Sequence, residues 1–128
     1  MVIGEKPKVR SYRDLIVWQK AMDLVRAIYG LTMIFPADER FGLISQIRRA
    51  AVSLPSNIAE GQARHTSREF VQFISHAEDS LAEVDTQLTL SNQLGFCNAS
   101  QTVEIFSLIE EIRKMLMSLR GRLDGQRR

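Results

Sequence analysis

The sequence has few of the residues that build a turn-rich or cross-linked fold. It contains one cysteine, three prolines and seven glycines among 128 residues. So few turn-forming residues argue against an all-β domain. Cys97 has no second cysteine with which to form an internal disulfide, as is usual in a reducing cytoplasm. We therefore expect a cytoplasmic protein in which Cys97 is a buried, unreactive thiol.

Long apolar runs are also missing. The longest runs are a few residues, whereas a helix that spans a bilayer needs about 20. Residues 1–10 are polar and charged and contain no apolar stretch of the kind found in signal peptides. We therefore expect neither a membrane segment nor secretion.

Motifs for catalysis and for cofactor binding are absent. The sequence contains no glycine-rich phosphate-binding loop and no nucleophile-elbow pattern. A di-metal site in a helical bundle needs Glu-x-x-His motifs, but Gln62 and Phe73 stand three residues before His65 and His76. One cysteine and two distant histidines do not form a zinc motif either. We expect no catalytic residues, no metal, no cofactor and no small-molecule substrate.

The residues that are present indicate a single helical domain. Apolar residues make up 45% of the chain and charged residues 25%, and this length suits one core. Four segments show the 3.6-residue period of amphipathic helices. The apolar stripes are, in order, Leu15, Trp18, Met22, Val25 and Tyr29, flanked by Ala21 and Ile28; Ile44, Ile47, Ala51, Leu54 and Ile58; Phe70, Ile74, Ala77, Leu81, Val84 and Leu88; and Ile105, Ile109, Ile112, Leu116, Leu119 and Leu123.

Local signals predict where these helices begin and end. Ser11 with Asp14 resembles a capping box, Phe35-Pro36 ends the first helix, and the second runs from near Asp38 to Gly61. Thr66-Ser67-Arg68-Glu69 is a capping box for the third helix, Gly95 is its C-terminal cap, and the fourth begins between Asn98 and Ser100. Short connections make consecutive helices antiparallel. The expected fold is all-α, an antiparallel up-and-down four-helix bundle of residues 1–128 with a core of about 12–123 and frayed ends.

Pro55 lies within the second predicted helix. Its ring removes the hydrogen bond to the carbonyl of Ala51. From the residues alone we expect either a kink or a break at this point.

Charge is distributed unevenly along the chain, although the net charge is only +2. Residues 40–68 contain five arginines and one acid, and residues 69–95 contain five acids and no lysine or arginine. Arg120, Arg122, Arg127 and Arg128 oppose only Asp124 near the C-terminus. These segments can pair within one bundle, pair between copies, or form two solvated faces.

Two sets of residues are candidate sites. Basic donors that could contact phosphates of RNA or DNA are Arg48, Arg49, Arg64, His65 and Arg68, with Arg120 and Arg122 as weaker candidates. The polar row Arg49, Ser53, Asn57 and Glu60 follows one side of the second helix, next to small residues. This row is either a solvated face or a subunit interface with a satisfied polar network.

Several blocks of the sequence resemble a known family. These are RDLIVWQKA at residues 13–21, GLISQIRRAAVSLPSNIAEG at residues 42–61, Ser67-Arg68-Glu69-Phe70, and Gly95-Phe96. They are similar to the four-helix-bundle proteins encoded by intervening sequences in bacterial 23S rRNA genes, and the resemblance covers residues 12–123. It is longest and most specific in the second helix, whereas the fourth helix matches in pattern only.

This resemblance implies properties that the spacing of residues does not provide. Members form homopentamers and have no known enzymatic activity or cofactor, and they resemble accessory variability determinant proteins of diversity-generating retroelements, which bind a reverse transcriptase and nucleic acid. The implied partners are therefore copies of the chain in a homopentamer, RNA or DNA, and a protein partner. The alternative function is a protein assembly module without nucleic-acid contact. The resemblance also implies that the second helix continues past Pro55 with a kink.

Overall fold

The computed structural model describes residues 11–125, and four long helices make up most of this part of the chain. Two short 3-10 helices precede α1 and α2 in the sequence. The elements are η1 (Tyr12–Asp14), α1 (Ile16–Thr32), η2 (Ala37–Glu39), α2 (Leu43–Gln62), α3 (Ser67–Gln93) and α4 (Ala99–Gly125). The predicted all-α four-helix bundle is confirmed.

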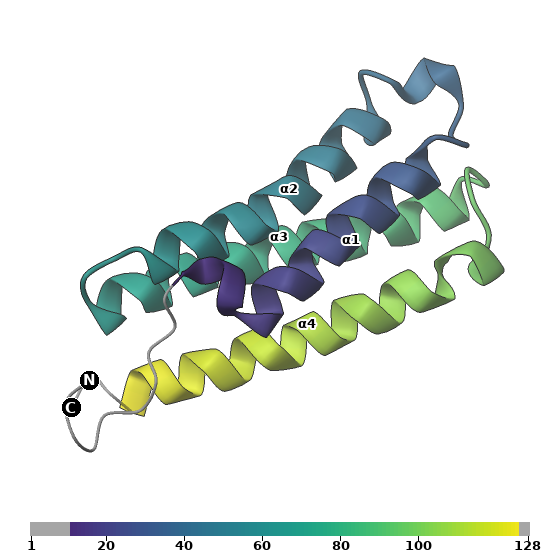
Figure 1. Cartoon of the computed structure of the whole chain (residues 1–128). Coiled ribbons are helices and arrows are strands. Elements are labelled where there is room, and N and C mark those ends of the chain that lie inside the picture. Colours follow the sequence, from purple (N-terminus) through teal and green to yellow (C-terminus); the bar gives the residue numbers. More distant parts are fainter. Residues whose placement is uncertain (1–10, 126–128) are drawn as a thin grey trace.

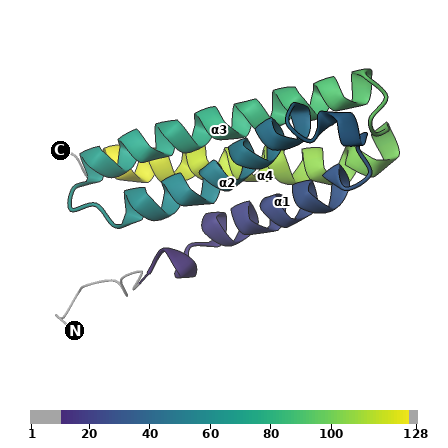
Figure 2. The same cartoon turned by 90° about the horizontal axis from the view of Figure 1, so that it is seen from above.

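The four helices run along a common direction (Figures 1 and 2). Within the described residues, α1 packs against α2 and α4, and α3 packs against α2 and α4, so α1 and α3 lie diagonally across the bundle. Consecutive helices are antiparallel, as expected from short connections. The α2–α3 loop and the last turns of α4 consequently lie at the same end of the bundle (Figure 1).

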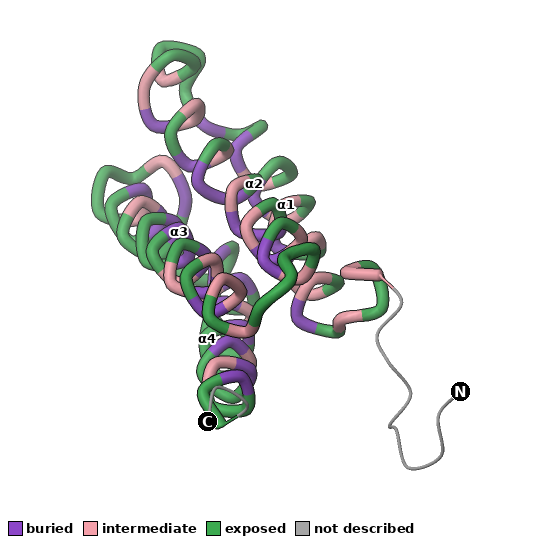
Figure 3. Tube along the Cα trace, turned by 90° about the vertical axis from the view of Figure 1, so that its left-hand side faces the viewer, coloured by how far each residue is buried: buried purple, intermediate pink, exposed green. Residues whose placement is uncertain are grey.

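The core lies between the four helices, toward which the buried parts of each helix are turned (Figure 3). The predicted stripe of α4 is buried at all six positions. The stripes of α2 and α3 are also confirmed, except that Ile44 and Phe70, each at an end of its stripe, are half-buried. A helix with one apolar side leaves little choice about which side packs inward.

The predicted centre of the α1 stripe is wrong, whereas its two flanking residues, Ala21 and Ile28, are buried as expected. Its buried residues are Val17, Ala21, Leu24, Ile28 and Thr32. Trp18 is half-buried, with its ring edge-to-face against Tyr12 at 5.3 Å between centroids, and Tyr29 is 41% exposed. Because α1 carries apolar residues on more than one side, its periodicity does not determine which line becomes the centre of the core.

Two predicted N-terminal caps are confirmed by their hydrogen bonds. The backbone N–H of Glu69 donates to Thr66 Oγ1 at 3.1 Å, immediately before α3. At the start of α4, the N–H of Gln101 donates to Asn98 Oδ1 and the N–H of Asn98 donates to Gln101 Oε1, both at 3.0 Å. The bonds are reciprocal at α4, and at both helix starts they satisfy amides that have no partner within the helix.

The predicted cap at the end of α3 is confirmed, whereas the predicted start of α1 needs correction. Gly95 has a φ of 78°, and the following N–H of Phe96 donates to the carbonyl of Ser91 at 3.0 Å, as in a Schellman motif. Ser11, in contrast, accepts from the N–H of Arg13 and caps η1. The long helix α1 begins only at Ile16.

Helix α2 continues through Pro55, which is buried. A break at this position, one of the two outcomes predicted from the residues, is therefore wrong, and the continuation implied by the family resemblance is confirmed. The kink stays a prediction.

The predicted frayed ends fall partly outside the described residues. Residues 1–10 and 126–128, including Arg127 and Arg128, are not described, whereas Asp124 and Gly125 belong to α4. Among residues 11–125, no helix is both long and apolar enough to cross a membrane.

Candidate functional site

The seven basic candidates fall into two separate groups. Arg48 and Arg49 lie in the first half of α2. The other five belong to the α2–α3 loop, the first turn of α3 or the last turns of α4, and so lie at one end of the bundle (Figure 1). Since α2 rises about 1.5 Å per residue, about 20 Å of helix separates Arg49 from the end of α2 at Gln62. The candidates therefore do not form a single patch.

Three of the predicted basic residues are exposed here, namely Arg64 and His65 in the α2–α3 loop and Arg68 in the first turn of α3. The loop is tight because α2 ends at Gln62 and α3 begins at Ser67. The N–H of Arg64 donates to the carbonyl of Gly61 at 3.1 Å, which continues the turn beyond the helix end. This end of the bundle is thus able to present several cationic donors to solvent.

Aromatic rings lie directly beside these cations. The guanidinium carbon of Arg64 is 4.6 Å from the centre of the Phe73 ring. The edge-to-face neighbour of Phe73 is His76, with 6.0 Å between ring centroids and 78° between planes. Arg64 and His76 are exposed and Phe73 is half-buried. Sequence reasoning missed Phe73, although its place three residues before His76 puts both on one side of the helix.

A glycine in α2 brings these rings close to the loop. A Cβ added to Gly61 would lie 2.7 Å from the Phe73 Cβ and 2.8 Å from a Phe70 ring carbon. Only glycine therefore permits this approach of α3 to the last turn of α2 without a shift of one helix.

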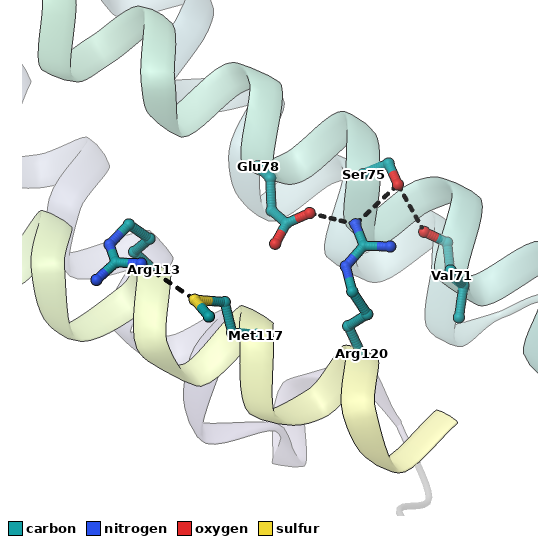
Figure 4. A network of polar contacts seen from close by, with 6 residues as sticks. All are labelled: Val71, Ser75, Glu78, Arg113, Met117 and Arg120. Carbon is teal, nitrogen blue, oxygen red and sulfur yellow. Dashed lines mark hydrogen bonds and ion pairs between the residues drawn. The ribbon is translucent and has the colours of Figure 1, made fainter. Parts of the chain in front are cut away.

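Arg120 is engaged within the bundle. Its guanidinium pairs with the Glu78 carboxylate and donates to Ser75 Oγ at 2.8 Å, both on α3 (Figure 4). Ser75 in turn donates to the carbonyl of Val71 at 3.3 Å. The positive charge of Arg120 is thus compensated by an acid, and this side chain joins α4 to α3.

Arg122 lies two residues further along, in the last turn of α4, and is exposed. It lines a hollow together with Asp14 and Ile16, so it belongs to the side of α4 that faces the start of α1. It therefore lies at the same end of the bundle as Arg64, His65 and Arg68. We call this end the basic end. Arg122 lies on a different side of α4 from Arg120.

Arg48 also serves as a link between helices. Its Nε donates to the buried Thr32 Oγ1 at 2.8 Å, and its Nη2 donates to the carbonyl of Tyr29 at 3.4 Å. The guanidinium carbon lies 4.5 Å from the centre of the Tyr29 ring. These contacts join α2 to the C-terminal end of α1, a role that the sequence did not reveal.

The predicted polar row on α2 is partly used inside the bundle. Ser53 Oγ is hydrogen-bonded to Ser80 Oγ of α3, and Asn57 Nδ2 donates to the carbonyl of Ser53 at 2.8 Å. Arg49 and Glu60 are exposed. Two residues of the row, Ser53 and Asn57, are therefore half-buried and hydrogen-bonded. The other two, Arg49 and Glu60, are charged and face outward.

All four residues of the row line a hollow of about 760 Å³ beside α2. Large apolar side chains share this hollow: Phe41 is 91% exposed, and Tyr29 and Val52 are each 41% exposed. Arg40 and Arg48 line it as well. Exposed aromatic residues beside arginines are typical of protein interfaces.

Sequence reasoning missed Phe41 and Arg40 as members of this surface. The available signal was a phenylalanine between Arg40 and Gly42, in a polar connection outside every apolar stripe. An aromatic residue that no core requires is a candidate for contact with another molecule.

A neighbouring hollow of about 500 Å³ lies between α2 and α3. It brings Arg49 and Phe41 of the α2 side to the same surface as Glu83 and Gln87 of α3. Gln87 Oε1 is buried and accepts no hydrogen bond from the described residues. The basic and acidic segments of the sequence therefore meet along this groove.

The thiol of Cys97 is buried, as predicted, at 7% exposure. Burial raises the pKa of this thiol above its ordinary value, which disfavours the reactive thiolate. Within residues 11–125, no three histidine, cysteine or acidic residues are grouped as a metal site requires.

Comparison with known proteins identifies the relatives of this fold. No curated protein matches the chain. A solved structure from Bacteroides thetaiotaomicron, described as a protein with unknown function from the S23 ribosomal protein family, has a TM-score of 0.74 and 23% sequence identity. The match covers 82% of this chain and 98% of that one, and at this identity it shows a shared fold.

The family comparison covers most of the chain. Residues 13–118 match the family described as 23S rRNA-intervening sequence protein. This range contains the two hollows beside α2, the α2–α3 loop and most of α4. The chain belongs to the 23S rRNA-intervening sequence protein family.

Proposed function

We propose that this chain is a non-catalytic, oligomeric module that contacts the phosphates of RNA or DNA through the end of the bundle that carries the α2–α3 loop. The observation that carries the proposal is the gathering of exposed Arg64, His65, Arg68 and Arg122 at this end. Phosphate oxygens accept hydrogen bonds from such side chains without regard to base sequence. The family's connection with a 23S rRNA gene supports the same class of ligand.

The second part of the proposal concerns self-assembly through the larger hollow beside α2. Phe41, Tyr29 and Val52 expose apolar surface there. Burying such surface against another copy would contribute about 25 cal/mol per Å², and Arg49 supplies charge complementarity to an acidic partner surface. Exposed acids on α3, namely Asp79, Glu83 and Asp85, provide such a surface on each copy. The family resemblance makes a homopentamer the expected assembly.

The second candidate function is protein assembly without nucleic-acid contact, as in an accessory protein for a reverse transcriptase. The 91% exposure of Phe41 favours it, because a large exposed apolar side chain stabilises protein contacts more than contacts with phosphate. In this alternative the basic end is solvated and Arg64, His65 and Arg68 have no ligand.

A salt titration distinguishes the two functions. We expect a structured RNA to bind at low salt, with log Kd changing against log salt by about 0.9 for each duplex phosphate neutralised. Arg68→Ala should reduce this slope by about one phosphate, whereas Arg120→Ala should leave it unchanged because Arg120 is paired with Glu78. If the RNA does not bind at low salt, or if its affinity does not change with salt, the phosphate-contact function is excluded. Protein assembly without nucleic-acid contact then remains as the function.

A further inference from the structure

Three features of the basic end distinguish it from a plain cluster of positive charges. The guanidinium carbon of Arg64 lies over the Phe73 ring, 4.6 Å from the ring centre. His76 contacts the same ring from its own position on α3. No acid pairs with Arg64 among residues 11–125. These planar groups are therefore held together at the surface while the charge of Arg64 stays uncompensated.

Planar groups of this kind bind the faces of nucleobases. Aromatic rings and guanidinium planes both stack on bases that are not already stacked in a helix. In a duplex each base face is covered by its neighbours, so only phosphates and groove edges are accessible. A site that presents both a planar stack and free cations therefore favours unpaired nucleotides over a duplex.

A second stack of the same kind lies nearby. Arg13 in η1 lies over the Tyr12 ring at 5.0 Å, and Tyr12 packs against Trp18. The short helix η1 contacts α2, whose last turns lead into the α2–α3 loop. The basic end thus carries two guanidinium–aromatic pairs from different elements. Successive unpaired bases of one strand could stack on two such pairs.

The third such pair in the bundle has a different role. Arg48 lies over Tyr29, but its Nε and Nη2 donate to Thr32 and to the Tyr29 carbonyl. These hydrogen bonds hold Arg48 between α1 and α2. No side-chain hydrogen bond of this kind holds Arg64 among the described residues, so its outer face and its donors remain accessible.

We infer that the basic end binds single-stranded nucleic acid, with an unpaired base stacked on the cluster formed by Arg64, Phe73 and His76. The inference rests on the proposed function, because it specifies which form of RNA or DNA this end accepts. The cations contact phosphates on either side of the stacked base, and the planar groups supply the preference for unpaired over paired nucleotides.

The test compares two substitutions that keep the charge. Arg64→Lys removes the planar group and retains the positive charge, whereas Arg68→Lys is the same change in the same region at an arginine that lies over no ring among the described residues. The probe is a fluorescein-labelled single-stranded RNA of about 15 nucleotides, with fluorescence anisotropy as the readout. We expect Arg64→Lys to weaken binding about tenfold and Arg68→Lys to leave it nearly unchanged. Phe73→Leu should weaken binding as Arg64→Lys does, and circular dichroism checks that each variant folds.

Three further probes separate stacking from charge. They are a single-stranded DNA of the same sequence, a blunt duplex, and an abasic strand with the same number of phosphates. We expect both single strands to bind more tightly than the duplex and the abasic strand. Equal binding of the abasic and normal strands, or equal effects of Arg64→Lys and Arg68→Lys, overturns the inference and leaves the proposed phosphate contact intact. Failure of every probe to bind at low salt overturns both.

Discussion

Two adjacent arginines of α2 have opposite environments. Arg48 is half-buried and bonded to Thr32 and to the Tyr29 carbonyl, whereas Arg49 is exposed and lines both hollows. Successive residues on a helix point about 100° apart, so one faces α1 and the other faces outward. Arg48 therefore joins two helices, whereas Arg49 stays at the surface.

Replacing Arg48 should destabilise the bundle. Arg48→Ala removes the hydrogen bond to the buried Thr32 Oγ1 and the contact with the Tyr29 ring, so we expect the free energy of unfolding to fall by about 1–2 kcal/mol. Arg26→Ala is the matched control, since Arg26 is exposed and pairs with Asp23 one turn away on the same helix; its effect should stay within about 0.5 kcal/mol. Urea unfolding measures both. Equal losses for the two variants would show that Arg48 does not link α1 to α2.

The sequence reveals the type of such residues more readily than their roles. Two separate clusters of arginines identified Arg48 and Arg49, and more weakly Arg120, as basic candidates, but the partners of Arg48 and Arg120 come from other helices. Thr32 is 16 residues from Arg48, and Glu78 is 42 residues from Arg120. Only tertiary packing decides which arginines are paired with acids or carbonyls of another helix. Periodicity and spacing therefore could not distinguish arginines that link two helices from arginines whose donors are free.

At the scale of elements, the helices differ in how well their residues define the packing side. Helix α4 has one continuous apolar stripe, and all six predicted positions are buried. Helix α1 has apolar residues around much of its circumference. Its buried line shares Ala21 and Ile28 with the edge of the predicted stripe and adds Val17 and Leu24. The bundle, the starts of α3 and α4 and the cap after α3 could thus be predicted from capping and periodicity. The starts of α1 and α2 could not, because short 3-10 helices occupy the positions near Ser11 and Asp38 at which the sequence predicts them. The rotation of α1 depends on the surfaces that α2 and α4 offer.

The closeness of α2 and α3 depends on Gly61. In Gly61→Ala the new Cβ would lie 2.7 Å from the Phe73 Cβ, an atom that cannot move far without its backbone. We expect the helices to separate locally and the free energy of unfolding to fall by about 1–3 kcal/mol.

The control for Gly61 is Gly30→Ala in α1. Its added Cβ has nothing within 4 Å, and alanine is the better helix former, so we expect a gain of about 0.5–1 kcal/mol. Both variants are measured by urea unfolding. A gain in stability for Gly61→Ala as well would mean that the contact with α3 is loose, and it would weaken the argument that Phe73 is held beside the loop.

For the whole molecule, the two candidate surfaces are separated along the bundle. The hollow with Phe41 and Arg49 lies beside the first half of α2, and the basic residues Arg64, His65 and Arg68 lie beyond its end. Copies could therefore assemble through one surface while the other stays open to a ligand. This separation means that a variant of one surface should leave the other functional.

Charge reversal at Arg49 tests that separation and the assembly together. Arg49→Glu places a second acid opposite Glu83 in the groove between α2 and α3, where the proposed neighbour would also bring acids. We expect light scattering to give about five times 14.6 kDa, or 73 kDa, for the unmodified chain and a mass near 14.6 kDa for the variant. Arg26→Glu makes the same reversal at an exposed arginine of α1 that does not line either hollow, and it should keep the larger mass. If Arg49→Glu keeps the larger mass but loses nucleic-acid binding, Arg49 contacts the ligand. If both the mass and the binding are unchanged, the polar row on α2 is a solvated face and not a subunit interface.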